Sequence, residues 1–387
     1  MIGRMRDLAW TNWLFFHRGD DFFDHLVRRV REARKSIQIE TYIFDIDPLT
    51  EELLKELGAA RRRGCRVQLL VDGVGSYIWL DTLKARCAEL GLELRVWVPV
   101  PRTFASFRRM LWLGGFRLLR IFRYFNRRNH RKIVLIDHRY GILGSQNWTQ
   151  VHSEKLMGEA AWRDSGLEIQ GPEIATLARS MGLAWRRSSP KRLKVPFRGL
   201  KDRRYQVGLS PLRLNQDRRS RRFLMNDLLD RIRNAQNRIL IESAYFLPSR
   251  RQFMALKRAA ARGVVVGVIL PDISDVPLVK WAAHDLIRAL VKAGVHIFEY
   301  QNRILHAKYT IVDDWATIGS SNFNHRSLFH DLEVEASFTQ SEPVNALVKQ
   351  WETDCERSKV IDPRQTHQDV FWKRWFFHLA FRLRYVL

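Results

Sequence analysis

The chain of 387 residues has little cysteine and no long apolar segment. Its three cysteines, Cys65, Cys87 and Cys355, lie far apart, are odd in number and follow no metal-ligand spacing. This usage argues against a disulfide framework or a cysteine-based zinc site, and it fits a reducing compartment. No run of about 18 apolar residues occurs, and residues 1–16 lack the pattern of a cleavable signal. We therefore expect a protein that does not cross a membrane.

Acidic residues are also scarce, and none occurs between Glu93 and Asp137. The formal net charge is +25 at pH 7, which implies a polyanionic partner such as an anionic bilayer or a nucleic acid. Within residues 101–129, a helical wheel separates an apolar side from a basic side. The apolar side has Phe104, Phe107, Leu111, Leu118, Phe122 and Phe125, and the basic side has Arg109, Arg120, Arg123 and Arg127.

This pattern is typical of a helix that lies in the headgroup layer of a membrane, although a lid packed on the protein core would also be amphipathic. Residues 366–387 have the same aromatic and basic composition, and we expect a second membrane contact there rather than a docked terminal helix. Charge alone does not exclude nucleic acid, but aromatic residues gathered on one side of a helix favour lipid.

One short pattern, His-x-Lys-x-x-x-x-Asp, occurs twice in the chain, and each copy is followed by Gly-Ser-x-Asn. A single His-x-Lys pair in a strand is usually a surface feature, but two copies with matching continuations indicate a catalytic site. The first copy consists of His130, Lys132, Asp137, Ser145 and Asn147, and the second of His306, Lys308, Asp313, Ser320 and Asn322.

Histidine and lysine two positions apart in a strand point to the same side of it. Asp137 and Asp313 come seven positions after the histidines, so in a continuous strand they would point to its other side. Each ends an apolar run, and we therefore expect a mainly structural role at a hairpin turn, although both aspartates complete the catalytic motif. Folding back at these turns would bring each serine roughly opposite the histidine of its own motif, with the asparagine one step further along the same side.

Such a duplicated set can break and remake a phosphodiester, because one imidazole attacks phosphorus while the other serves the leaving group. The lysines, Ser145, Asn147, Ser320 and Asn322 would bind the phosphate, and no metal is required. Each histidine also needs a carboxylate on its other ring nitrogen. Asp164 and Glu333 are the candidates, although either could be an ordinary surface acid.

Strand-like runs at 67–71 and 264–270 alternate with helical stretches at 51–63 and 278–293. We therefore expect an α/β protein of two duplicated α-β-α sandwich domains that face each other across one shared active site. The expected division is 1–185 for the first domain, 186–222 for a basic linker, 223–365 for the second domain and 366–387 for the terminal segment.

At these motifs the chain resembles the phospholipase D superfamily, and within it the bacterial cardiolipin synthases of the short type without N-terminal transmembrane helices. Further segments carry the resemblance, among them 37–44, 60–67, 70–76 and 293–300. Two runs depart from the usual pattern of these synthases, namely Gly144-Ser145 in place of Gly-Gly, and Asn324-His325-Arg326-Ser327 in place of an Asp-Pro-Arg-Ser type.

The resemblance implies transfer of a phosphatidyl group through a phosphatidyl-histidine intermediate, without a cofactor. His130 would be the nucleophile and His306 the general acid and then base. The partners would be anionic membrane phospholipids, phosphatidylglycerol with or without phosphatidylethanolamine, at the cytoplasmic face of the bacterial cell membrane. Two alternatives are weighed against this function. The first is a hydrolase that uses the same residues on phospholipid or nucleic acid, and the second is an inactive scaffold that binds anionic lipid or nucleic acid through charge alone.

Overall fold

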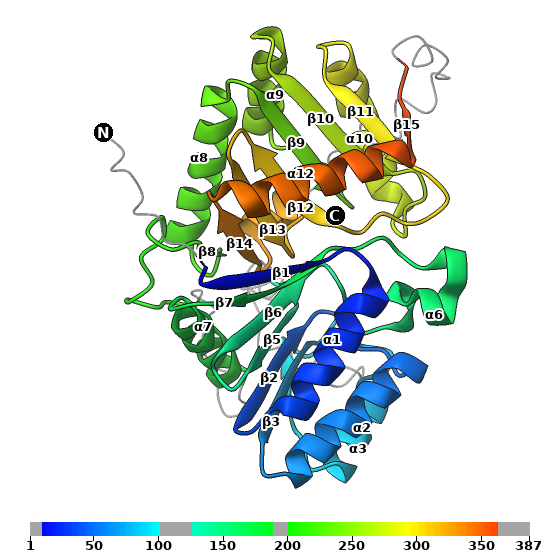
Figure 1. Ribbon diagram of the computed structural model, residues 1–387, viewed down its shortest axis with the longest axis vertical. Coiled ribbons are helices and arrows are strands. Elements are labelled where there is room, and N and C mark those ends of the chain that lie inside the picture. Colours follow the sequence, from blue (N-terminus) through cyan, green and yellow to red (C-terminus); the bar gives the residue numbers. More distant parts are fainter. Residues whose placement is uncertain (1–9, 101–125, 189–199, 363–387) are drawn as a thin grey trace, which may run out of the picture.

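The computed structural model describes residues 10–100, 126–188 and 200–362, which fold into two similar α/β halves (Figure 1). Each half is built on one mixed β-sheet with helices against it. The duplicated α/β architecture predicted from the sequence is therefore confirmed. Residues 366–387 and most of the predicted insertion at 101–129 lie outside the described residues.

The first sheet has the strand order β1-β7-β6-β5-β2-β3-β4. Its strands are β1 (Asn12–Phe16), β2 (Ser36–Thr41), β3 (Arg66–Asp72), β4 (Glu93–Trp97), β5 (Ile133–Ile136), β6 (Tyr140–Gly144) and β7 (Gly166–Gln170). Its helices are α1 (Gly19–Glu32), α2 (Pro48–Arg62), α3 (Leu80–Glu89), α6 (Glu154–Met157) and α7 (Ile174–Arg187), with single 3-10 turns at Gln150–His152 and Gly158–Ala160.

The second sheet has the order β15-β11-β10-β9-β12-β13-β14-β8. Its strands are β8 (Leu212–Leu214), β9 (Arg238–Ser243), β10 (Val265–Pro271), β11 (His296–Tyr300), β12 (Lys308–Val312), β13 (Trp315–Gly319), β14 (Val334–Phe338) and β15 (Ser358–Val360). Its helices are α8 (Arg218–Asn234), α9 (Arg250–Ala261), α10 (Pro277–Val291), α11 (His325–Phe329) and α12 (Ser341–Glu356).

The two sheets share one topology. In the first, β2, β3 and β4 run parallel and β5 pairs antiparallel with β2; in the second, β9, β10 and β11 run parallel and β12 pairs antiparallel with β9. The amino ends of β5 and β12 therefore lie at the same sheet edge as the carboxyl ends of the parallel strands. The motif histidines lie in the short segments that lead into β5 and β12, so this edge positions the site.

Apolar periodicity explains how the helices cover the sheets. The buried side of α1 carries Phe22, Phe23, Leu26 and Val30, which pack with α2 and β2 in one core, and α8, α9 and α10 cover the second sheet in the same way. A further apolar cluster contains residues of both sheets together with α7 and α12, and it holds the halves together. No helix in the described ranges has the length and apolar character needed to span a bilayer.

The predicted linker at 186–222 is too long. Leu212–Leu214 forms β8, which pairs with β14 at the end of the second sheet, and α8 begins at Arg218. The arginine-rich composition hid both elements. β8 is short but completely buried, and α8 is capped by Asp217, whose carboxylate accepts the Ser220 backbone N–H.

Candidate active site

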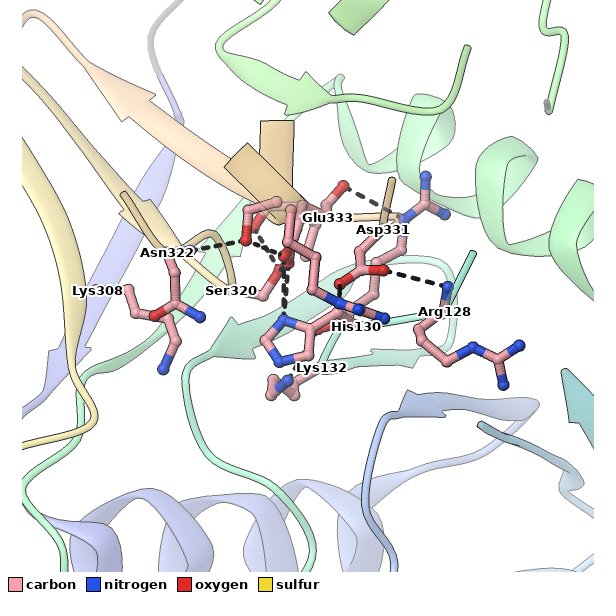
Figure 2. Close-up of polar contacts among 12 residues, drawn as sticks. Arg128, His130, Lys132, Lys308, Ser320, Asn322, Asp331 and Glu333 are labelled. Atoms are coloured by element: carbon pink, nitrogen blue, oxygen red, sulfur yellow. Dashed lines mark hydrogen bonds and ion pairs between the residues drawn. The ribbon is translucent and has the colours of Figure 1, made fainter. Parts of the chain in front are cut away.

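Two histidines, one from each half, lie in the same site, and each is bound to a carboxylate of the other half. Nδ1 of His130 lies 3.1 Å from both carboxylate oxygens of Glu333 (Figure 2). Nδ1 of His306 lies 2.7 Å from Oδ1 of Asp164. The two candidate acids are therefore exchanged between the halves, an arrangement that the sequence had left open.

Backbone hydrogen bonds fix this exchanged pairing. Isolated parallel β-bridges join Asn129 to Leu332 and Arg163 to Leu305, directly beside the histidines and the acids. The backbone N–H of His130 donates to the Leu332 carbonyl at 3.0 Å, and that of His306 to the Arg163 carbonyl at 2.7 Å. Each histidine is thus held by the segment that carries its acid.

The pairing determines which ring nitrogen is available for chemistry. A carboxylate accepts hydrogen bonds, so Nδ1 of each histidine carries a proton and Nε2 is left for the substrate. Burial and the neighbouring Lys132 hold the pKa of His130 well below its usual value. Burial and Lys308 lower the pKa of His306 to about 3, against the opposing effect of Asp164. Both imidazoles are therefore neutral before substrate binds.

The two acids differ in their readiness to ionise. Burial raises the pKa of Glu333 to about 7, although Lys132, Ser320 and Ser327 favour its charged form. Burial also acts to raise the pKa of Asp164, but the two histidines around it reverse the effect and hold that pKa well below its usual value. Asp164 is the stronger acid of the two.

The motif lysines are buried beside the histidines. Nζ of Lys132 donates to the carbonyl of His130 at 2.9 Å, and Nζ of Lys308 donates to the carbonyl of His306. Burial lowers the pKa of Lys132 to about 7 and that of Lys308 to about 8. A phosphodiester bound between them would favour their charged forms, because an anion stabilises a nearby ammonium group.

The motif serines were expected to bind phosphate, but in the structure their hydroxyls contact the two acids. The hydroxyl of Ser145 donates to Asp164 at 2.7 Å. The hydroxyl of Ser320 donates to Glu333, a contact drawn as a dashed line in Figure 2. Both serines are completely buried. They therefore orient the acids, and the sequence could not show this because the acids come from outside the motif.

The motif asparagines lie at the site, as expected. Asn147 and Asn322 are almost fully buried, and each follows the hairpin that carries the histidine of its half. Asn147 Oδ1 accepts the Ile43 backbone N–H at 3.4 Å, whereas Asn322 Oδ1 has no protein partner within the described part of the chain.

Asp137 and Asp313 lie at the turns of the two hairpins, at the opposite ends of β5 and β12 from the histidines. The Asp137 carboxylate accepts the backbone N–H groups of Arg34, Lys35 and Ser36, which lead into β2. Asp313 does the same for 236–238, which lead into β9. These contacts fit the structural role expected at the turns and give no support to a catalytic one.

Two residues at the site were missed by the sequence analysis. His152 Nδ1 lies 2.5 Å from Asp164 Oδ2, and the Ser327 hydroxyl donates to Glu333 at 2.7 Å. A signal was present in the repeat, because each residue comes five positions after the motif asparagine of its half. Comparison of the two copies beyond Gly-Ser-x-Asn would have placed them at equivalent positions.

His152, Asp164 and His306 bring possible metal-binding atoms within 4.8 Å of one another. The hydrogen bonds do not fit a metal, however. His152 Nε2 accepts the backbone N–H of Asn147 at 3.1 Å, so the ring proton lies on Nδ1, the nitrogen that faces Asp164. A protonated nitrogen cannot ligate a metal, and these residues instead form a hydrogen-bonded group.

Known proteins share both the sequence pattern and the fold. The chain matches the family described as "Cardiolipin synthase, PLD-like domain" over residues 26–179 and 228–358. It is 30% identical over 359 residues to cardiolipin synthase B of Shigella flexneri, covering 90% of this chain and 82% of that protein. It is 32% identical over 319 residues to cardiolipin synthase B of Salmonella typhi, covering 82% and 73%.

Among solved structures, phosphatidylserine synthase of Haemophilus influenzae Rd KW20 matches with a TM-score of 0.70 at 13% identity, over 100% of this chain and 98% of that one. This likeness shows the same fold. Fold, paired histidines and family match together define a duplicated enzyme of the phospholipase D superfamily. Within that superfamily, the chain belongs to the cardiolipin synthase family with PLD-like domains.

Proposed function

We propose that the protein transfers a phosphatidyl group from one phospholipid to a hydroxyl of phosphatidylglycerol and so makes cardiolipin. The observation that carries this proposal is the pair of histidines, each with Nε2 available and each bound at Nδ1 by a carboxylate of the other half. Cardiolipin synthase B, at about 30% identity over most of the chain, supports the choice of substrates.

In the first step, Nε2 of His130 attacks phosphorus and forms a P–N bond, while the P–O bond to the leaving alcohol breaks. His306 takes up a proton on Nε2 when the phosphodiester binds, becomes an imidazolium held by Asp164, and gives that proton to the leaving oxygen. In the second step, the acceptor hydroxyl gives its proton to His306 and its oxygen displaces His130 from phosphorus. The order of the two histidines follows the one that the family resemblance implies.

Lys132, Lys308, Asn147 and Asn322 would stabilise the charge on the non-bridging oxygens in both steps. In this scheme Asp137 and Asp313 have structural roles only. The lipid substrates require contact with a membrane, and we propose a peripheral protein at the cytoplasmic face of the cell membrane. The net charge of +25 supports attraction to anionic lipid.

The test is incubation of the purified protein with phosphatidylglycerol vesicles, with and without phosphatidylethanolamine and with a chelator present, followed by lipid mass spectrometry. We expect cardiolipin from the wild-type protein and none from His130→Ala or His306→Ala. His296→Ala, which changes an exposed histidine at the start of β11, is the matched control. Release of ethanolamine together with cardiolipin would identify phosphatidylethanolamine as the phosphatidyl donor, whereas release of glycerol would identify phosphatidylglycerol.

Other products would contradict the proposal in distinct ways. Phosphatidic acid without cardiolipin would mean that water replaces the lipid alcohol and that the protein is a hydrolase. Absence of any lipid product would direct the search to nucleic acid phosphodiesters.

A further inference from the structure

The hydrogen bonds around the two acids follow one plan with two differences. His130 Nδ1 contacts both oxygens of Glu333 whereas His306 Nδ1 contacts only Oδ1 of Asp164, and the first half has an imidazole where the second has a hydroxyl. His152 and Ser327 occupy equivalent places: the Asn147 backbone N–H donates to His152 Nε2, and the Asn322 backbone N–H donates to the Ser327 hydroxyl, both at 3.1 Å. Each residue then donates to the acid of its own half. The site is therefore built from two copies of one arrangement, with an imidazole in the first copy and a hydroxyl in the second.

The contacts of His152 fix its protonation. A backbone N–H can only donate, so Nε2 must be the unprotonated, accepting nitrogen, and the ring proton lies on Nδ1. That proton is directed at Asp164 Oδ2 over 2.5 Å. If His152 were an imidazolium, its Nε2–H would face the Asn147 backbone N–H, and the two donor hydrogens would repel each other. His152 is completely buried and is held as a neutral donor.

Both acids have donors on both oxygens, but only Asp164 has a different imidazole on each of them. Asp164 Oδ1 accepts from His306 and from the Ser145 hydroxyl, both at 2.7 Å, and Oδ2 accepts from His152. Donors that bind a carboxylate favour its ionised form, and the two imidazoles reverse the effect of burial on the pKa of Asp164, whereas Lys132 and the hydroxyls of Ser320 and Ser327 leave the pKa of Glu333 raised. An ionised acid behind His306 stabilises that histidine when it carries the extra proton.

We propose that His152 is a positioning residue that keeps Asp164 ionised and aimed at His306, and that it thereby makes His306 the proton-transferring histidine of the duplicated pair. This inference rests on the proposed transfer reaction, in which His306 protonates the leaving oxygen. His152 itself does not touch the substrate in this scheme, because both of its ring nitrogens are bound to protein groups.

The test compares two leaving groups. A glycerol oxygen needs a proton as it leaves phosphorus, whereas p-nitrophenolate leaves without one, so only the first depends on a general acid. We would measure kcat/KM for phosphatidylglycerol and for the p-nitrophenyl ester of phosphatidic acid with wild-type, His152→Leu and His152→Gln proteins. Glutamine can donate to Asp164 and accept from Asn147, but leucine can do neither.

We expect His152→Leu to lower kcat/KM for phosphatidylglycerol by roughly 10- to 100-fold and for the nitrophenyl ester by less than about threefold. His152→Gln should remain within about threefold of wild type on both. Equal losses on the two substrates would overturn the proposal, since a merely structural role does not discriminate between leaving groups. Equal losses in the glutamine and leucine variants would also overturn it.

A second readout does not depend on activity. In protein labelled with 15N-histidine, the His152 signals are those that disappear in His152→Gln, and their shifts report which nitrogen is protonated. We expect a neutral ring with the proton on Nδ1, and a proton on Nε2 would refute the inference. Wild-type protein that cleaves the nitrophenyl ester but makes no cardiolipin would refute the proposed function alone.

Discussion

At the scale of single residues, burial governs the chemistry of the site. Lys132, His306 and Lys308 are almost completely shielded from solvent, and the His130 side chain is 12% exposed. Loss of hydration disfavours the charged form of each. The positive forms of these histidines and lysines must therefore be stabilised by the negative charge of the paired acids and of the bound phosphate. The free enzyme is therefore sensitive to pH near neutrality.

The two lysines give a prediction for this sensitivity. A lysine with a lowered pKa loses its charge as the pH rises through that pKa, which is about 7 for Lys132 and about 8 for Lys308. We expect kcat/KM for a dispersed short-chain phosphatidylglycerol to be highest below about pH 7, to fall about tenfold per pH unit between about pH 7 and 8, and to approach a hundredfold fall per unit above about pH 8, where both lysines lose their proton. The measurement is a pH profile of kcat/KM, which reports groups of the free enzyme.

A profile that stays flat from about pH 6 to 9 would contradict this prediction, because it would mean that both lysines keep their charge. The profile of kcat serves as the internal control. Bound phosphate favours the charged lysines, so kcat should decline at a higher pH than kcat/KM does.

At this scale, some site residues could be predicted from the sequence and their pairing could not. The repeated spacing predicted the histidines, lysines and asparagines, because residue parity in a strand fixes which side chains lie together. The pairing of each histidine with its acid could not be predicted, since the partners are 203 and 142 positions apart and meet only when the two halves pack. The roles of Ser145, Ser320 and His152 depend on that pairing and were inaccessible for the same reason.

At the scale of elements, the hairpins β5-β6 and β12-β13 present the histidines at one end and are anchored at the other. Asp137 and Asp313 have φ angles of 51° and 50°, in the left-handed region that aspartate tolerates better than most residues. Their backbone contacts join the hairpin turn to the start of the neighbouring parallel strand. The predicted strands and helices at 67–71, 264–270, 51–63 and 278–293 are found as β3, β10, α2 and α10.

This anchoring predicts that the motif aspartate serves stability. Asp137→Ala leaves three backbone N–H groups without their acceptor, and we expect it to lower the free energy of unfolding by about 2 kcal/mol. The backbone N–H groups hold the Asp137 pKa below its usual value. Its contribution should therefore be present above about pH 4 and be lost at lower pH. Urea denaturation at several pH values would measure both effects.

Asp314→Ala is the matched control, because Asp314 is the exposed neighbour of Asp313 in the second turn and its carboxylate accepts no backbone N–H within the described part of the chain. We expect the purified Asp137→Ala protein to keep its activity within a few-fold when assayed well below its unfolding temperature. A loss of several hundredfold in kcat without a change in stability would instead assign the aspartate to the chemistry.

At the scale of the whole molecule, the carboxyl edges of both sheets border the shared site. The loop between β3 and α3 lies at this edge and exposes apolar side chains, with Ile78 84% exposed. The loop after β10 occupies the equivalent place and exposes Ile273. An apolar rim of this kind, on a protein of net charge +25, fits contact with an anionic bilayer.

We therefore predict that Ile78→Glu weakens sedimentation with phosphatidylglycerol vesicles by roughly fivefold or more, since it places a charge where the loop would enter the lipid. Cleavage of a monomeric nitrophenyl phosphodiester should be unchanged. Val265→Glu is the matched control, because Val265 is also exposed but begins β10 at the opposite sheet edge. Equal effects of the two substitutions would show that the loop is not a lipid contact.

The exchange of acids between the halves has a consequence for the growing polypeptide. When the first half leaves the ribosome it contains His130, but Glu333 has not yet been synthesised, and its own Asp164 awaits a histidine from the second half. Neither half can assemble a reactive centre by itself. Phosphodiester chemistry thus begins only after translation has passed Glu333 and the two sheets have packed, so that completion of the chain acts as the switch that turns the enzyme on.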